Sequence, residues 1–159
     1  MLRLAKFKQT KAPAVKQSQM MLESNLKALG AVAYDLLLPE TQALPHLIHG
    51  DEQILGIVYG KYKMHINAQK GRGALVATNH RILLVDKKPL FEKVDELAYR
   101  VVSGVTYVSV GLTGTVTLHT RMGDISVRTF NHDCANTFVK AVETSIFENP
   151  LREAGYDNA

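Results

Sequence analysis

Six histidines and one cysteine are the residues of this chain best suited to metal binding or nucleophilic catalysis. His46 and His49 are three residues apart, but neither an HExxH motif nor paired cysteines accompany them, and zinc needs three or four such ligands. Cys134 lies close to His132, as a nucleophile lies close to its base. Both fall in the first turn of an expected helix, where a buried thiol is the simpler interpretation. We therefore expect no catalytic residue, no metal site and no cofactor.

The clustered carboxylates and glycines are also better explained by structural roles than by catalysis or phosphate binding. Glu92, Asp95 and Glu96 resemble a general acid–base pair, but they occur in an alternating strand pattern typical of a solvated face. The glycine clusters at residues 71–73 and 111–114 lack the GxxxxGK[ST] pattern and the strand-to-helix context of a phosphate loop. Both are typical of turns.

Charge is distributed unevenly along a chain of 159 residues with a net charge of +4. Residues 1–19 contain lysines and an arginine but no acid, and acids predominate in residues 143–159. We expect residues 1–17 to be a basic flexible arm, either solvated or in contact with lipid headgroups, nucleic acid or an acidic protein. Residues 149–159 are expected to form a frayed tail.

The length of the apolar stretches and the cysteine content limit which classes of protein this chain can belong to. The longest apolar stretch, residues 29–38, carries Asp35 and is much shorter than the ~20 residues of a membrane-spanning helix. We expect no transmembrane segment and no secretion signal. The single Cys134 forms no internal disulfide, which favours a cytoplasmic location, with or without peripheral attachment to a membrane.

Residues 18–49 predict a helical extension. Apolar residues follow helical spacing from Ser18, a possible cap, up to Pro39, which is expected to end one helix and begin a second. In the second helix, Leu44, Leu47 and Ile48 are expected to pack on the domain that follows. The apolar face of the first helix comprises Met21, Leu22, Leu26, Leu29, Val32, Ala33, Leu36 and Leu37.

Residues 50–148 predict an antiparallel β domain closed by a helix. The clearest signal is residues 74–86, in which two apolar runs flank Thr78-Asn79-His80, a typical hairpin turn. Further strands are expected at residues 54–59, 91–97, 105–110, 116–120 and 125–130. Residues 60–72 are expected to form a long turn region, with or without some strand extending into it. Asn131 is a good cap for the last helix, whose apolar stripe is Ala135, Phe138, Val139, Val142 and Ile146.

This pattern resembles the bacterial pleckstrin-homology-like (PH-like) domains of the YokE-like type. The resemblance rests on Asp51, Glu52, Ile54, Leu55, Gly73, Thr78, Asn79, Arg81 and the helix containing Phe138. It implies a mainly β fold: a partly open barrel of two near-orthogonal antiparallel sheets capped by the C-terminal helix. It implies a non-enzymatic binding or assembly module, and no binding residue is inherited from the family.

In such a barrel the turns after strands one, three and six gather at the open end. That placement predicts a cationic rim made of Lys61, Lys63, Lys70, Arg72, Lys87, Lys88 and Arg121. Tyr62 and Met64 are expected beside it as interfacial side chains. Such a rim suits an anionic membrane surface, with each cation contributing about 1 kcal/mol.

Self-association is the competing expectation. Related domains assemble into rings, an open barrel leaves strand edges available, and Met21, Leu22, Leu26 and Leu29 offer an apolar extension face for a second copy or another protein. Nucleic acid is an unlikely partner because no helix concentrates lysine and arginine. The sequence thus leaves a homo-oligomer or scaffold, a protein partner and an anionic membrane surface as the expected roles.

Overall fold

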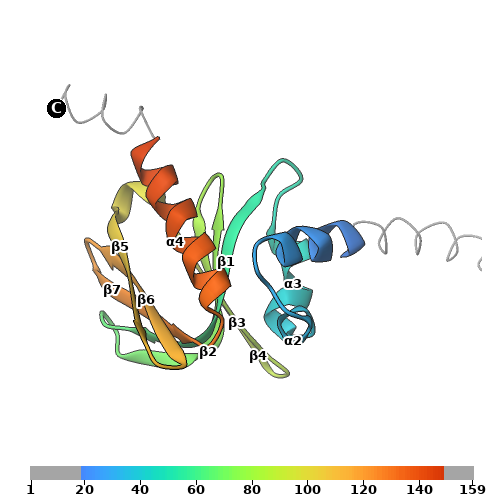
Figure 1. The fold of residues 1–159 in the computed structure, drawn as a ribbon, viewed down its shortest axis with the longest axis horizontal. Coiled ribbons are helices and arrows are strands. Elements are labelled where there is room, and N and C mark those ends of the chain that lie inside the picture. Colours follow the sequence, from blue (N-terminus) through green and yellow to red (C-terminus); the bar gives the residue numbers. More distant parts are fainter. Residues whose placement is uncertain (1–18, 149–159) are drawn as a thin grey trace, which may run out of the picture.

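The computed structural model describes residues 19–148 (Figure 1). The expected basic arm over 1–17, the cap at Ser18 and the tail over 149–159 lie outside the described residues. Seven antiparallel strands form one sheet in the order β4-β3-β2-β1-β7-β6-β5. Their bounds are β1 (Ile54–Met64), β2 (Gln69–Thr78), β3 (Ile82–Lys88), β4 (Phe91–Leu97), β5 (Val102–Val110), β6 (Thr113–Thr120) and β7 (Gly123–Thr129).

The sheet curls around β1, so its two halves correspond to the two sheets that the resemblance implies. β1 pairs with β2 along its whole length, but it pairs with β7 only over Lys61 to Met64. The two halves are therefore continuous through the end of β1, and β4 and β5 are the two edges. α4 (His132–Phe147) lies against the concave side of the sheet (Figure 1). The expected partly open barrel with a C-terminal cap is confirmed.

The hairpin at residues 74–86 is confirmed with its register. Ala74 lies opposite Val85 and Ala77 lies opposite Ile82. Thr78 Oγ1 closes the turn by accepting hydrogen bonds from the amides of His80 and Arg81 at 3.1 and 3.0 Å. The short polar break between the two apolar runs thus sets the pairing of β2 with β3.

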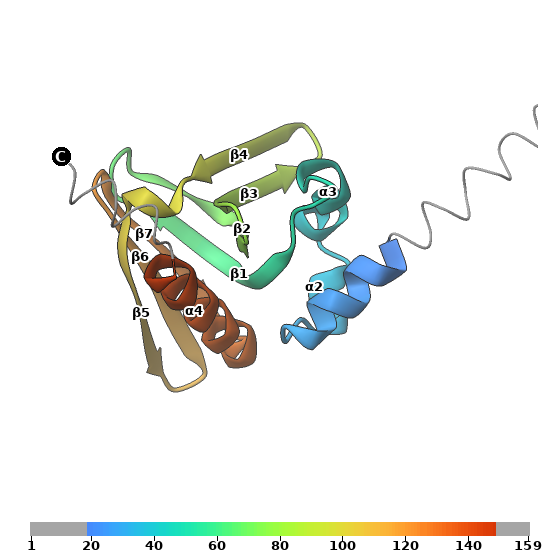
Figure 2. The ribbon, with the colours of Figure 1, turned by 90° about the horizontal axis from the view of Figure 1, so that it is seen from above.

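Both faces of this half of the sheet are buried. Alternate residues such as Val58 and Leu84 point to the inner core, where they pack with Phe138 of α4. Their neighbours Ile57 and Leu83 point to the outer face, where the N-terminal helices cover them. Figure 2 shows α4 on one side and these helices on the other. Continuous apolar runs in β1, β2 and β3 follow from this two-sided burial.

The N-terminal extension is broken where one helix was expected. Residues 19–28 are helical, but Gly30 has a φ of +107° and ends the helix before α2 (Ala33–Leu36). Gly30 also approaches α4 so closely that a Cβ there would lie 2.9 Å from the amide nitrogen of Cys134. A glycine is therefore required both for the backbone angle and for the packing.

Pro39 begins α3 (Pro39–Leu47), as expected. Leu44 is fully buried under this helix, and Leu47 and Ile48 pack against the same outer core. The expected packing of the second helix on the β domain is confirmed.

The turn expected at residues 60–72 is much shorter than the main expectation, because strand extends into this region from both sides. β1 continues to Met64 and β2 begins at Gln69, so only residues 65–68 lie between the strands. Lysines on the solvent side and glycines on both strands hid the strand pattern, because neither contributes apolar alternation. The basic residues assigned to this turn lie on strands, where their spacing is regular.

Candidate functional site

Five cations line the outer face of the sheet beyond the helices, and we call them the cationic strip. On β1, Tyr62 is buried in the inner core, so Lys61 and Lys63 on either side of it point outward and are exposed. The neighbouring strands add cations at the same level. The strip comprises Lys61 and Lys63 of β1, Lys70 and Arg72 of β2, and Arg128 of β7.

Strand register places these cations directly opposite one another. Lys61 faces Arg72 on one side and Arg128 on the other, while Lys63 faces Lys70. Like charges at opposed positions destabilise a sheet by a few tenths of a kcal/mol or more. None of the five forms an ion pair with a carboxylate in residues 19–148. Their positive charge is therefore concentrated and uncompensated.

A shallow hollow of about 610 Å³ lies among these residues. Its lining includes the five cations, Thr115 and Ser126, but no acidic residue from the part of the chain that the structure describes. The strip thus offers cationic groups and hydroxyl donors to a ligand in one concave patch, without a carboxylate to repel an anion.

Lys87 and Lys88 lie at the end of β3 beside α3, and both are already paired. Lys87 Nζ is 3.4 Å from Glu92 Oε2, and Lys88 Nζ is 2.7 Å from Asp86 Oδ1. Lys88 Nζ is also 3.4 Å from Glu40 Oε1 of α3. Burial alone would lower the pKa of Lys88, but these two carboxylates outweigh it and raise that pKa. The Lys88 side chain therefore joins α3 to the sheet, and the Lys87 side chain joins β3 to β4.

The three turns expected at one rim do not gather at one place. The β1–β2 and β6–β7 turns are adjacent, since the amide of His65 donates to the carbonyl of Asp124 at 3.0 Å. Arg121 lies in the second of these turns and lines neither the hollow nor the groove described below. The β3–β4 turn lies beside α3 instead (Figure 2).

Two expected interfacial side chains are placed differently. Tyr62 is only 4% exposed, and its hydroxyl donates to Asp86 Oδ2 at 2.6 Å. Burial and that carboxylate raise its pKa. Met64 is half-buried, also on the inner side. The exposed apolar side chains near this end of the sheet are instead Ile66 and Met122, in the two adjacent turns.

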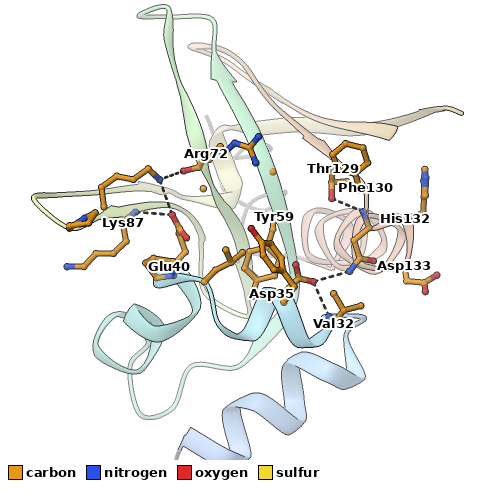
Figure 3. A pocket seen from close by; sticks show the side chains of 18 residues that line it. Val32, Asp35, Glu40, Tyr59, Arg72, Lys87, Thr129, Phe130, His132 and Asp133 are labelled. Carbon is orange, nitrogen blue, oxygen red and sulfur yellow. Dashed lines mark hydrogen bonds and ion pairs between the residues drawn. The ribbon is translucent and has the colours of Figure 1, made fainter. Parts of the chain in front are cut away.

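A second and larger cavity, of about 740 Å³, adjoins the strip, and we call it the groove (Figure 3). The N-terminal extension forms one wall with Val32, Leu38 and Pro39, and Tyr59 of β1 lies between that wall and Phe130. Arg72 lines both the groove and the hollow. The outer face therefore presents an apolar channel that continues into a cationic patch.

The expected extension face is mostly used within the chain itself. Leu26 is fully buried in the outer core, and Leu22 and Leu29 are half-buried against it. Of the four residues expected to face another copy, only Met21 is largely exposed, together with its neighbour Met20. The surface that the extension leaves for a partner is therefore narrower than the sequence suggested.

The residues considered for catalysis, Cys134 and His132, are buried or hydrogen-bonded within the fold. Cys134 is fully buried, and burial, with Asp35 and Asp133 nearby, raises the pKa of its thiol to about 12. His132 contacts the hydroxyl of Tyr107 through Nδ1 and the carbonyl of Leu112 through Nε2. A thiol kept protonated in this way is a poor nucleophile.

The clustered carboxylates are engaged with cations. Glu92 pairs with Lys87, Asp95 with Lys93 and Glu96 with Arg81. Within residues 19–148, no group of three or more His, Cys, Asp or Glu is placed to hold a metal ion. None of the helices in this part of the chain is both long and apolar enough to cross a membrane.

Arg128 is the strip residue that sequence reasoning missed. It lies in a strand with alternating apolar residues, 66 positions after Tyr62, and joins the strip only because β7 pairs with the end of β1. The alternation of Ile125, Val127 and Thr129 with outward residues was the available signal. It placed Arg128 on a solvated face but not beside Lys61.

Comparison with known proteins identifies the family. The model described as "Bacterial PH domain" matches residues 48–144. A DUF1696 family protein with a pleckstrin-homology domain from Shewanella loihica PV-4 is 14% identical, with a TM-score of 0.47 over 66% of this chain and 88% of that one. The Vps36 N-terminal PH domain is 19% identical, with a TM-score of 0.48 over 65% of this chain and 85% of that one. Curated proteins provide no match. Since the family model covers more than half of the sequence, this chain belongs to the bacterial PH domain family.

Proposed function

We propose that this protein binds anionic lipid surfaces through the cationic strip. PH domains are generally non-catalytic binding modules, which agrees with the engaged carboxylates and the buried thiol of this chain. The observation that carries the proposal is the strip itself: five cations on one face, opposed in the strands and unpaired with any acid in the described residues. The fold tolerates this repulsion, which an anionic partner would relieve.

Two further features favour a lipid surface over a compact anion. The hollow is open and extends over β1, β2, β6 and β7. The exposed Ile66 and Met122 lie in the β1–β2 and β6–β7 turns. Apolar tips beside cations suit an interface of headgroups and acyl chains. Five cations at about 1 kcal/mol each would give on the order of 5 kcal/mol, a weak and reversible attachment.

The test is pelleting of the full chain with phosphatidylcholine vesicles that contain phosphatidylserine. We expect the double variant Lys63→Glu/Lys70→Glu to reduce the pelleted fraction several-fold, because it reverses two charges of the strip. Binding by the unaltered chain should also decline steeply at high salt. Vesicles of phosphatidylcholine alone provide the ligand control.

The matched control is Arg100→Glu/Lys140→Glu, which makes the same charge change at exposed residues away from the strip. Equal loss of pelleting in both double variants would show that only net charge matters. Pelleting that survives the strip variant would contradict the proposal.

Self-association is a second candidate, and β5 supports it. β5 is an edge of the sheet and contains no charged residue over Val102–Val110. Its end exposes Val108 and Val110, and Leu112 follows in the adjacent turn. The other edge, β4, carries Glu92, Lys93, Asp95 and Glu96. Natural edges are usually protected by such charges, so β5 is the edge suited to pair with another copy.

Light scattering tests this second candidate. Pairing through β5 predicts a mass that is a multiple of 17.6 kDa and that falls to the monomer in Val108→Lys. Val94→Lys, on the charged edge β4, is the matched control and should leave the mass unchanged. A monomeric unaltered chain at high concentration would exclude self-association.

A further inference from the structure

The groove is built by residues that precede the family match together with residues inside it. Its wall from α2 and α3 precedes residue 48, where the match to the family begins. The floor and the opposite wall come from Tyr59, Gly60 and Gly73 of the sheet and from Phe130. A cavity of about 740 Å³ in this position is therefore a product of how this chain's extension packs on its sheet.

Hydrogen bonds hold the groove open at both ends. At one end, Asn131 Nδ2 donates to the Gly30 carbonyl at 2.9 Å and to Asp35 Oδ2 at 3.2 Å. At the other end, the amide of Lys87 donates to Glu40 Oε1 at 3.2 Å (Figure 3). The extension is thus fixed to the cap of α4 on one side of the channel and to β3 on the other. Little rearrangement would be needed for a ligand to enter, which favours binding.

Apolar side chains are exposed at the mouth of the groove. Phe130 is 74% exposed, Tyr34 69% and Val32 54%, although all three line the cavity. Figure 3 shows Val32 and Phe130 on the side of Tyr59 that faces His132 and Asp133, away from Glu40 and Lys87. Exposed apolar groups that converge on one cavity are the usual setting for an apolar ligand.

The charges around the groove leave one cation available, together with one carboxylate, Asp133, which has no ion pair in the described residues but whose side chain points away from Tyr59 and Arg72 (Figure 3). Asp35 is bonded to Asn131 and to the amide of Val32, and Glu40 is bonded to Lys88. Lys87 is occupied by Glu92. Among the described residues that line the groove, Arg72 is the cation without a carboxylate partner. A ligand that fits would combine a linear apolar body with one anionic group.

We propose that the groove binds a single-chain anionic amphiphile, with its acyl chain between Val32 and Phe130 and its acidic group at Arg72. This inference rests on the proposed function in one respect, because Arg72 also belongs to the cationic strip. It goes further by assigning a second kind of contact: one lipid chain held inside the protein, in addition to headgroups attracted at its surface.

The experiment is a titration of the full chain with dodecanoate below its critical micelle concentration, followed by calorimetry. We expect saturable binding that weakens about tenfold in Val32→Ser/Phe130→Ser, because two apolar contacts are lost. Both side chains are more than half exposed, so the variant should stay folded. Val110→Ser/Leu112→Ser removes two exposed apolar side chains elsewhere and should leave the affinity unchanged.

The charge requirement is tested separately. Arg72→Gln should weaken dodecanoate binding about tenfold, since a charge-assisted hydrogen bond is lost. Dodecyltrimethylammonium, which carries the same chain with a cation, should bind more weakly than dodecanoate to the unaltered protein. Equal binding of the two amphiphiles would overturn the assignment of the acidic group to Arg72.

Failure of this inference is distinguishable from failure of the proposed function. Lys63→Gln/Lys70→Gln should reduce vesicle pelleting and leave dodecanoate affinity unchanged, because neither lysine lines the groove. Conversely, Val32→Ser/Phe130→Ser should weaken dodecanoate binding and retain strip-dependent pelleting. Absence of saturable dodecanoate binding, or binding that Val32→Ser/Phe130→Ser leaves unchanged, would overturn the groove assignment whatever the vesicles show.

Discussion

Arg81, in the turn between β2 and β3, and the cationic strip differ in how their positive charge is compensated. Arg81 donates from Nε to Glu52 Oε2 at 2.9 Å, from Nη1 to Glu96 Oε2 at 3.0 Å, and from Nη2 to the carbonyl of Leu47 at 2.9 Å. The strip residues face one another without an acid. One cation is fully used in joining the hairpin turn to the residues that precede β1. The others have no acidic partner in the described residues, which is the reason that we propose an anionic partner for them.

The largest expected effect comes from breaking the Arg81 cluster. The side chain of Glu52 is fully buried and Arg81 is only 14% exposed. Glu52→Gln should therefore lower the free energy of unfolding by about 3 kcal/mol, because a partly buried guanidinium loses its charged partner. Chemical denaturation measures the change. Glu96→Gln, at the exposed end of the same cluster, should change it by less than about 1 kcal/mol.

The same cluster predicts an acid-sensitive stability. Burial alone would raise the pKa of Glu52, but hydrogen bonds from Arg81, Thr78 and the amide of His49 lower it from 4.5 to about 2. A lowered pKa stabilises the fold above pH 4.5, and that contribution is lost as the pH falls toward 2. The loss should be roughly 3 kcal/mol. Denaturation curves between pH 6 and 2 should show a shallower decline in Glu52→Gln.

A smaller effect is expected at Asn131, which joins the groove to α4. Its side chain caps α4 by accepting from the Cys134 amide at 3.1 Å and also holds Gly30 and Asp35. Asn131→Ala should cost about 1–2 kcal/mol in thermal or chemical denaturation. Asn136→Ala, at an exposed position in the same helix, should be nearly neutral or slightly stabilising. An equal effect of the two changes would show that the cap contributes little.

The smallest effect has the opposite sign and addresses the strip directly. Lys63→Glu replaces one of two opposed lysines in β1 and β2. It should raise the free energy of unfolding by roughly 0.2–1 kcal/mol, since an attraction replaces a repulsion. The gain should shrink in 1 M salt, where the interaction is screened. Destabilisation by Lys63→Glu would mean that the strip is not under electrostatic stress.

The elements with strong local signals were predictable from the sequence. The hairpin at residues 74–86 combined apolar runs with a turn that Thr78 closes, and α4 combined a cap with a stripe centred on Phe138. These features depend on neighbours in the chain. The site depends on register between distant strands, and for that reason Arg128 was not foreseen.

The errors have specific physical causes. The helix expected across residue 30 ends because Gly30 must approach the first turn of α4, a contact more than a hundred residues away in sequence. The strand continuing to Met64 was hidden because its outward residues are lysines and its inward partners include Gly71 and Gly73. The groove was not foreseen, since its two walls meet only after both the extension and β7 are in place.

Because the N-terminal extension covers the outer core, the unit that folds stably includes the extension as well as the β domain. Leu26, Leu36 and Leu44 shield Ile57 and Leu83, although all three leucines precede the segment shared with the family. A fragment consisting of residues 48–144 would expose an apolar surface on β1, β2 and β3 and would tend to aggregate. The segment that matches the family is therefore smaller than the smallest fragment that we expect to fold. A shortened form of the protein must retain the leucines that precede the barrel.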